Sequence, residues 1–273
     1  MPDRTSSSYL PGFFRRISAL VGVIILISGC SQVSPASRHF DIFDKLGFSK
    51  AKEEKPIAAL FPPSAPGTAL PAPPMEANSS VRRAVNLLLR GDGAFIKKSL
   101  ERRQEHYETI TAILKDEGIP LELTNLALIE SGFRCEARSY AGAVGMWQFT
   151  RSTAKRYGLV VSGSVDQRKD PILSTLAAAR MLRDLYRTFQ DWYLVLAAYN
   201  AGPGAVNRAL QRSGSDNFWG AAKSGGLSGQ TKEFVPKFIA ATLLVRAYEK
   251  HGPDNLSKSV ALELDALESS GRF

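Results

Sequence analysis

The chain has 273 residues, a formal net charge of +9 at pH 7 and a hydrophobic content of 44%. That length and apolar content suffice for one domain with a substantial core. Two cysteines are too few for a disulfide framework, and three histidines far apart in the sequence (His39, His106 and His251) are a poor metal-ligand set. We therefore predict no metal and no cofactor, and the positive charge favours an anionic partner.

The first segment is typical of an exported protein. Arg15 and Arg16 precede an apolar run over residues 17–27 that is too short to span a bilayer comfortably. The run ends in Leu26-Ile-Ser-Gly-Cys30, which resembles the lipobox of bacterial lipoproteins. Residues 1–29 are thus predicted to be a lipoprotein signal peptide and Cys30 the lipidation site, and the alternative is an ordinary signal peptide. Ser31 after the cysteine resembles proteins sorted to the outer membrane.

A lipid anchor at Cys30 has three consequences. The domain would lie in the periplasm, where it meets no nucleic acid, so an anionic cell-wall polymer is the simpler partner. Cys135 would have no disulfide partner and is predicted to be a small buried residue. Residues 30–80, with the Pro- and Ala-rich stretch 60–74, would be a flexible linker between membrane and domain.

Residues 81–255 are predicted to form one all-α domain, followed by a C-terminal tail over 256–273. Apolar residues at helical spacing predict helices over 81–90, 94–117, 120–132, 171–189, 192–200 and 236–250, with a short helix after Thr150. Asp170 and Asp191 have the position of N-caps, and Pro171 that of a first-turn proline. The only candidate strand is residues 260–264 in the tail.

One carboxylate in this pattern is unusual. Glu130 falls on the apolar face of its predicted helix, one turn after Ala127 and Leu126. A carboxylate facing that way loses solvation, so its pKa should rise and it should hold a proton near neutral pH, as a general acid must. The segment alone slightly favours a simpler interpretation, either a buried glutamate satisfied by hydrogen bonds or a helix end that turns it toward solvent.

Four ordered motifs add a resemblance. They are Glu130-Ser131, the glycine-rich Gly142-Ala-Val-Gly-Met-Trp-Gln148, Ala197-Ala-Tyr-Asn-Ala-Gly-Pro-Gly204 and Thr231-Lys-Glu-Phe-Val-Pro-Lys237. Together they resemble the soluble-lytic-transglycosylase (goose-lysozyme-like) domain of bacterial murein transglycosylases over about residues 85–250. The surrounding sequence is most similar to the membrane-bound lytic murein transglycosylases of the D type.

The resemblance implies a lysozyme-like helical fold with a substrate groove, and peptidoglycan glycan strands as substrate. It implies non-hydrolytic cleavage of the β-1,4 bond from N-acetylmuramic acid to N-acetylglucosamine, leaving a 1,6-anhydro end. Glu130 would be the acid and then the base. Ser139, Gln148, Tyr199 and Asn200 would contact substrate or line the site.

This chemistry is compatible with a single carboxylate. Hydrolysing glycosidases usually need two carboxylates, whereas attack by the substrate's own C6 hydroxyl needs no activated water. Other carboxylates have simpler interpretations: Asp170 as a helix cap, and Glu136 and Asp166 as solvent-facing loop residues. Met146 and Trp147 are either core residues or, for an aromatic ring near the site, a surface on which sugar stacks.

Two positions depart from the family pattern. Phe234 stands where the family usually has a tyrosine that bonds to the glutamate or the substrate, and Cys135 stands where a proline is common. Two alternatives therefore accompany the transglycosylase interpretation: a muramidase that uses water on the same fold, and a cell-wall-binding lipoprotein with a weakened site. The sequence names no protein partner in the cell envelope.

Overall fold

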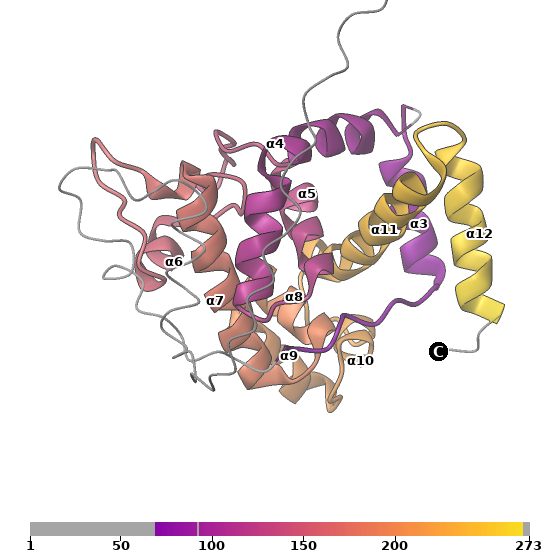
Figure 1. Ribbon diagram of the computed structural model, residues 1–273. Coiled ribbons are helices and arrows are strands. Elements are labelled where there is room, and N and C mark those ends of the chain that lie inside the picture. The colour runs from indigo at the N-terminus through magenta and orange to yellow at the C-terminus, as the bar shows by residue number, and fades with distance from the viewer. Residues whose placement is uncertain (1–68, 92, 270–273) are drawn as a thin grey trace, which may run out of the picture. The chain divides into compact units, whose positions relative to one another are not determined.

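A computed structural model describes residues 69–91 and 93–269 (Figure 1). Within these ranges the regular structure is helical, with isolated β-bridges only, which confirms the predicted all-α class. None of the helices in the described ranges is long and apolar enough to cross a membrane. The predicted signal peptide, Cys30 and the linker up to residue 68 lie outside the described residues.

Most of the helices follow one another through short connections, but a long loop over residues 132–150 separates α5 from α6. In chain order they are α3 (Ser79–Leu88), α4 (Ala94–Asp116), the 3-10 helix η2 (Leu121–Leu123), α5 (Thr124–Ser131), α6 (Arg151–Arg156), the 3-10 helix η3 (Gln167–Lys169), α7 (Pro171–Phe189), α8 (Trp192–Ala201), α9 (Pro203–Ser213), α10 (Phe218–Lys223), α11 (Gly229–His251) and α12 (Leu256–Ser269). Side chains cap several of them as predicted: Thr150 caps α6, Asp170 caps α7 and Asp191 caps α8.

Helix α11 is the centre of the packing that positions the site. It contacts α3, α5, α8 and α12 (Figure 1). The apolar side chains of Phe238, Ile239 and Leu244 along it are fully buried. Helix α7 packs against α4 and α8. Helices α5 and α8, which carry Glu130 and Tyr199, are therefore both fixed on α11.

The described residues 69–80, which belong to the predicted linker, pack on the domain. The indole of Trp192 donates to the Pro71 carbonyl (2.6 Å) and the hydroxyl of Tyr193 to the Pro74 carbonyl (3.0 Å). Ala77 is buried. Prolines lack an N–H, but their carbonyls still accept, and partly buried Trp and Tyr donors need such acceptors.

The predicted C-terminal tail contains a packed helix, α12, in place of a candidate strand. Leu256, Val260 and Leu264 are buried at intervals of four residues, which places them on one helical face toward α11. Arg82 of α3 also pairs with Glu268 through two contacts, Nε to Oε1 at 2.9 Å and Nη2 to Oε2 at 2.6 Å.

The last predicted helix starts seven residues earlier than expected. Pro236 is well suited to a first turn, but it lies inside α11, which begins at Gly229. The missing N–H leaves one helical hydrogen bond unmade. Phe234, Val235 and Phe238 are buried around the proline, and this apolar burial offsets the loss.

Candidate active site

Helix α5 ends immediately after the candidate acid. Gly132 caps it in the left-handed conformation (φ 60°), and a side chain there would lie 2.6 Å from the Ser99 hydroxyl. Arg102 donates to the Gly132 carbonyl. The abrupt end of α5 holds Glu130 in its last turn, where the chain turns away into the glycine-rich loop.

Glu130 is partly buried. Loss of solvation raises the pKa of its carboxyl from an ordinary 4.5 to about 7, and the nearby charge of Lys237 opposes that rise. Among the described residues, no hydrogen bond or ion pair engages the Glu130 carboxylate. The predicted rise in pKa is thus present, and about half of the groups would carry a proton at neutral pH.

Lys237 is a functional candidate that the sequence interpretation missed. Its ammonium donates to the Ile129 carbonyl (3.1 Å), next to Glu130 in the chain. Burial lowers the pKa of Lys237, and the charge of Glu130 opposes the decrease. The sequence carries a signal, because Lys237 interrupts an apolar stretch of α11 just as Glu130 interrupts one on α5.

Tyr199 and Asn200 lie in the last turn of helix α8, and each forms a hydrogen bond with a different partner. The Tyr199 hydroxyl donates to the Trp147 carbonyl (2.7 Å), and burial, then the charge of Glu130, raises the pKa of the phenol. Tyr199 therefore lies within electrostatic reach of Glu130. The amide oxygen of Asn200 accepts from the hydroxyl of Thr231 (3.1 Å), which joins α8 to the first turn of α11.

The glycine-rich loop is a compact hairpin-like turn. Its backbone pairs Val144 with Phe149 in both directions, at 3.0 and 3.1 Å. Gly145 has φ 88°, and a Cβ on it would lie 1.8 Å from the carbonyl oxygen of Arg168. Only glycine allows this close approach. The hydroxyl of Ser131 donates to the Met146 carbonyl (2.9 Å), so the residue after Glu130 ties α5 to the loop.

A partly buried ion pair also supports this loop. Arg168 contacts both carboxylate oxygens of Asp166, each at 2.7 Å, and it also donates to the carbonyls of Gly142 and Phe149, each at 3.2 Å. Hydrogen bonding to Arg168 lowers the pKa of Asp166. The prediction that Asp166 faces solvent is therefore wrong: it supports the loop.

Ser139 and Gln148 both bond within the loop. The exposed Ser139 accepts from the backbone N–H of Ala143 (3.0 Å). The Gln148 side-chain amide donates to the Gly145 carbonyl (2.9 Å), and its backbone has φ 52°, an uncommon value for a residue with a side chain. Both side chains thus fix the loop, and their contact with substrate stays a prediction.

Four other residues singled out in the sequence are buried or partly buried. Met146 and Trp147 are fully buried, and the Trp147 indole donates to Thr175 (2.9 Å), so the core interpretation holds for both. Phe234 is 7% exposed and offers no hydroxyl. Cys135 is partly buried, with its sulfur 3.5 Å from the His106 ring.

Two other carboxylates considered as second catalytic groups are engaged elsewhere. Glu136 is exposed and forms an ion pair with Lys169. Asp170 accepts from the backbone N–H groups of Ile172 (2.9 Å) and Leu173 (2.8 Å), as predicted for an N-cap. No group of three or more metal-ligating side chains occurs among the residues that the structure describes.

Comparison with known proteins finds a family match over the middle of the chain. The Transglycosylase SLT domain family matches residues 108–221, which contain the first three motifs and Glu130. Residues 108–221 thus match the SLT domain, and the chain is similar to lytic murein transglycosylases. The predicted resemblance to the SLT domain is therefore confirmed. The fourth motif, with Lys237, lies beyond the matched residues.

The relatives of this SLT domain include longer proteins. Membrane-bound lytic murein transglycosylase D of Escherichia coli K12 is 33% identical over 180 residues, which cover 64% of this chain and 39% of that protein. Peptidoglycan transglycosylase gp16 of phage T7 is 39% identical over 106 residues, covering 38% of this chain and 8% of that protein. The chain thus spans about two fifths of the transglycosylase D that it matches.

Among solved structures, an inactive mutant of lytic transglycosylase Slt from Pseudomonas aeruginosa has a TM-score of 0.48 and 22% identity, covering 64% of this chain and 28% of that one.

Proposed function

We propose that this SLT-domain protein is a lytic transglycosylase that cleaves peptidoglycan glycan strands without consuming water. The observation that carries the proposal is Glu130: a partly buried carboxyl with a pKa of about 7 and, among the described residues, no bonded partner. A group poised in this way can give a proton and take one back at neutral pH. The engagement of Glu136, Asp166 and Asp170 elsewhere supports a one-carboxylate reaction.

In this reaction Glu130 first gives its proton to the glycosidic oxygen as the bond from that oxygen to C1 of N-acetylmuramic acid breaks. The resulting carboxylate then takes the proton of the muramic C6 hydroxyl as the C6 oxygen bonds to C1. The products are a chain end with a free hydroxyl and a 1,6-anhydro-N-acetylmuramic acid end. The attacking hydroxyl belongs to the substrate, so its effective concentration is high.

The surrounding residues would favour different protonation states of Glu130. The Tyr199 hydroxyl already donates to Trp147, so toward Glu130 its oxygen can only accept, which favours the protonated acid. The positive charge of Lys237 favours the carboxylate formed after proton transfer. Ser139 and Gln148 would contact the sugar beside the loop that they help to fix, and Asn200 would contact it from the end of α8.

We propose that the chain acts as an outer-membrane lipoprotein anchored through Cys30, with the domain in the periplasm. The lipobox-like sequence supports this location, and the related transglycosylase D is described as membrane-bound. Labelling cells with a tagged fatty acid would test it: the chain should become labelled and Cys30→Ala should not. An unlabelled wild-type chain in the same cells would contradict the anchor.

The activity test is a digest of purified sacculi with the full chain, kept in detergent, followed by mass analysis of the soluble products. Anhydro ends would support the transglycosylase, reducing ends the muramidase, and binding without products the cell-wall-binding lipoprotein that Phe234 suggests. Glu130→Gln should lower product formation by about 10³-fold, the scale of a lost general acid. Glu136→Gln, which removes an exposed carboxylate, should leave the rate unchanged.

A further inference from the structure

The carboxyl end of α5, whose last turn carries Glu130, is closed by its own backbone. The N–H of Gly132 bonds to the Leu128 carbonyl (2.8 Å), and the N–H of Phe133 bonds to the Ala127 carbonyl (3.2 Å). This closure is common where a residue in the left-handed conformation follows the last turn. A helix end still leaves its last four carbonyls without intrahelical partners, and at this end they belong to residues 129–132.

Three cationic side chains donate to carbonyls of this last group. They are Lys237 of α11 to Ile129 (3.1 Å), Nε of Arg134 to Ser131 (2.9 Å) and Arg102 of α4 to Gly132. A positively charged donor is favoured at the carboxyl end of a helix, because the exposed carbonyls carry partial negative charge. The three side chains come from separate segments, so the end of α5 is held where α4, α11 and the following loop meet.

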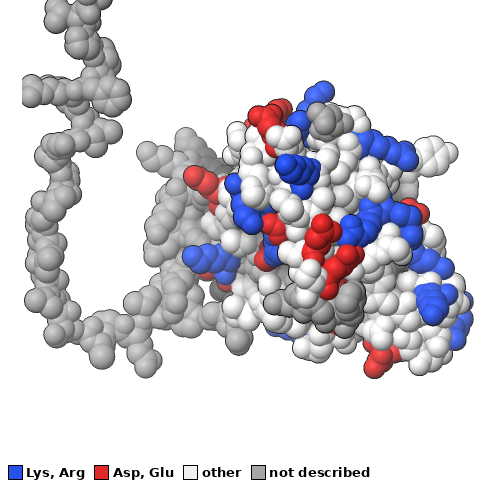
Figure 2. Space-filling model, turned by 90° about the vertical axis from the view of Figure 1, so that its right-hand side faces the viewer, with Lys and Arg blue, Asp and Glu red and all other residues white. Residues whose placement is uncertain are grey.

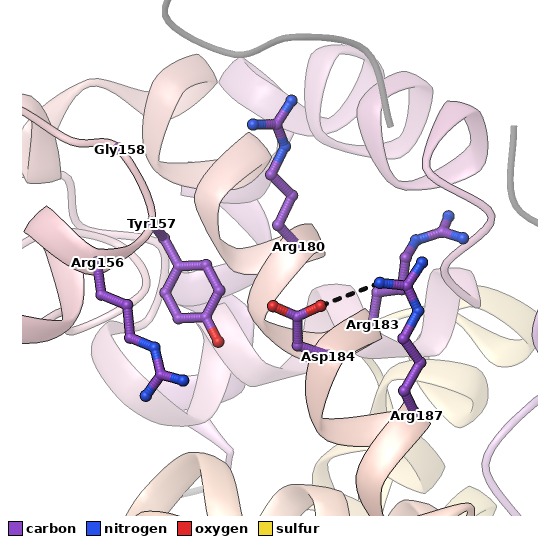
Figure 3. A pocket seen from close by; sticks show the side chains of 7 residues that line it. All are labelled: Arg156, Tyr157, Gly158, Arg180, Arg183, Asp184 and Arg187. Carbon is purple, nitrogen blue, oxygen red and sulfur yellow. Dashed lines mark hydrogen bonds and ion pairs between the residues drawn. The ribbon is translucent and has the colours of Figure 1, made fainter. Parts of the chain in front are cut away.

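The arginines of the cavity beside α7, of about 390 Å³, are arranged differently. Arg156 from the end of α6 and the arginines of α7 point apart, and Asp184 lies between them (Figure 3). One ligand could not engage these guanidinium groups together. The cationic groups at the end of α5, in contrast, share one short stretch of backbone as their target.

Helix α4 lies close against the residue to which Arg102 donates. A Cβ on Gly132 would lie 3.0 Å from Nη1 of Arg102 and 2.6 Å from the hydroxyl of Ser99, which is fully buried. Arg102 itself is partly buried. This contact leaves the end of α5 little room to shift, and it lies two residues after Glu130.

We propose that Arg102 is a positioning residue that fixes the direction of the Glu130 carboxyl through the backbone of the last turn of α5. The Ser131 hydroxyl joins the same turn to the Met146 carbonyl of the glycine-rich loop (2.9 Å). A general acid must lie within hydrogen-bond reach of the oxygen that it protonates, and a misplacement of about 1 Å can cost about 10²-fold in rate. This role rests on the proposed function, because the direction of the carboxyl matters only if Glu130 is the acid.

Hydrogen–deuterium exchange of the full chain in detergent tests the contact without any substrate. Arg102→Met keeps much of the side-chain length and removes the donor, so the amides of residues 128–134 should exchange about tenfold faster. Arg103→Met is the matched control, because Arg103 is the next residue of α4, is also partly buried and pairs with Glu249 of α11 (2.7 Å). It should change exchange in the same peptides by less than about twofold.

Kinetics on solubilised glycan strands test the consequence for the reaction. At a temperature where all variants stay folded, Arg102→Met should lower kcat by about tenfold and leave KM unchanged. The pH–rate profile should keep its shape, because the charge that opposes the rise in the pKa of Glu130 is that of Lys237. Arg102→Lys, which keeps a cationic donor, should recover most of the lost kcat, and Arg103→Met should leave kcat unchanged.

Two results would overturn the role of Arg102. One is unchanged exchange over residues 128–134 in Arg102→Met, which would mean that its hydrogen bond does not hold the turn. The other is faster exchange with an unchanged kcat, or with a kcat that Arg103→Met lowers equally, which would make the contact structural only. A wild-type chain that released no anhydro ends would contradict the proposed function itself, and the exchange result would still decide whether Arg102 holds the end of α5.

Discussion

Two carboxylates near the glycine-rich loop, Glu130 and Asp166, have pKa values shifted in opposite directions. Asp166 is bonded at both oxygens to Arg168, which lowers its pKa. Glu130 has no such partner among the described residues, and its burial raises its pKa to about 7. The difference between them is their surroundings, because both are ordinary acids in water. A paired carboxylate builds the loop, and a carboxylate without a bonded partner is left to react.

On one face of the molecule the surface charge is mixed in sign (Figure 2). On the face shown in Figure 2, lysines and arginines are spread widely and interleaved with acidic groups. Such a mixture gives no strong field of one sign on that face. The net charge of +9 can attract an anionic polymer, but the specific electrostatics lie at the few buried charges.

The largest expected effect on stability would come from breaking the ion pair between Asp166 and Arg168. Arg168→Gln leaves Asp166 partly buried without its partner and removes donors from the Gly142 and Phe149 carbonyls. We expect the free energy of unfolding to decrease by about 3 kcal/mol, measured by urea denaturation. Arg156→Gln, at an exposed arginine, should change it by less than about 0.5 kcal/mol. A loss below about 1 kcal/mol for Arg168→Gln would contradict a supporting role.

The raised pKa of Glu130 and the lowered pKa of Asp166 predict opposite dependences of stability on pH. Folding raises the pKa of Glu130 from 4.5 to about 7, so the folded state holds this proton more tightly than the unfolded state. The resulting stabilisation is complete below pH 4.5 and is lost as pH rises to about 7, by at most about 3 kcal/mol. Asp166 has a lowered pKa, so its contribution is lost in acid instead.

Stability curves of the wild-type chain and Glu130→Gln test this sign. The difference between their free energies of unfolding should shift in favour of the variant between pH 4.5 and 7, and stay constant above about pH 8. Asp166→Asn should instead show its pH-dependent difference below about pH 4. Parallel curves for Glu130→Gln and the wild-type chain would mean that the folded pKa of Glu130 is not raised.

Local signals explain what the sequence could predict. Asp170 and Asp191 cap helices within three residues of themselves, so their roles can be inferred from spacing alone. Glu130 stands out because its neighbours one turn away are apolar. The four-residue spacing of Leu256, Val260 and Leu264 also predicts a helix, but a short apolar segment of this kind is compatible with a strand as well.

Distant partners explain what the sequence could not predict. Pro71 and Pro74 pack because Trp192 and Tyr193, more than a hundred residues later, donate to their carbonyls. The Arg168 contact with the loop carbonyls likewise joins segments that only folding brings together. Lys237 was visible in a motif, but its role follows from its contact with Ile129 across the α5–α11 interface.

The smallest expected effect would come from Lys237→Met, which tests how the charge of Lys237 acts on Glu130. Replacing it by methionine keeps much of the side-chain volume and removes the charge that opposes the rise in the Glu130 pKa. The pKa of Glu130 should therefore increase further, and the alkaline limb of the pH–rate profile for sacculus digestion should move to higher pH. At low pH the rate should change only a few-fold.

Lys232→Met is the matched control, because it removes the same charge from the same helix five residues earlier. It should leave the alkaline limb in place. Lys237→Arg, which keeps the charge, should restore the limb toward its wild-type position if the charge is what matters. A uniform loss of rate at every pH in Lys237→Met, with no shift of the limb, would mean that Lys237 acts only through its hydrogen bond to Ile129 and holds the end of α5 in place.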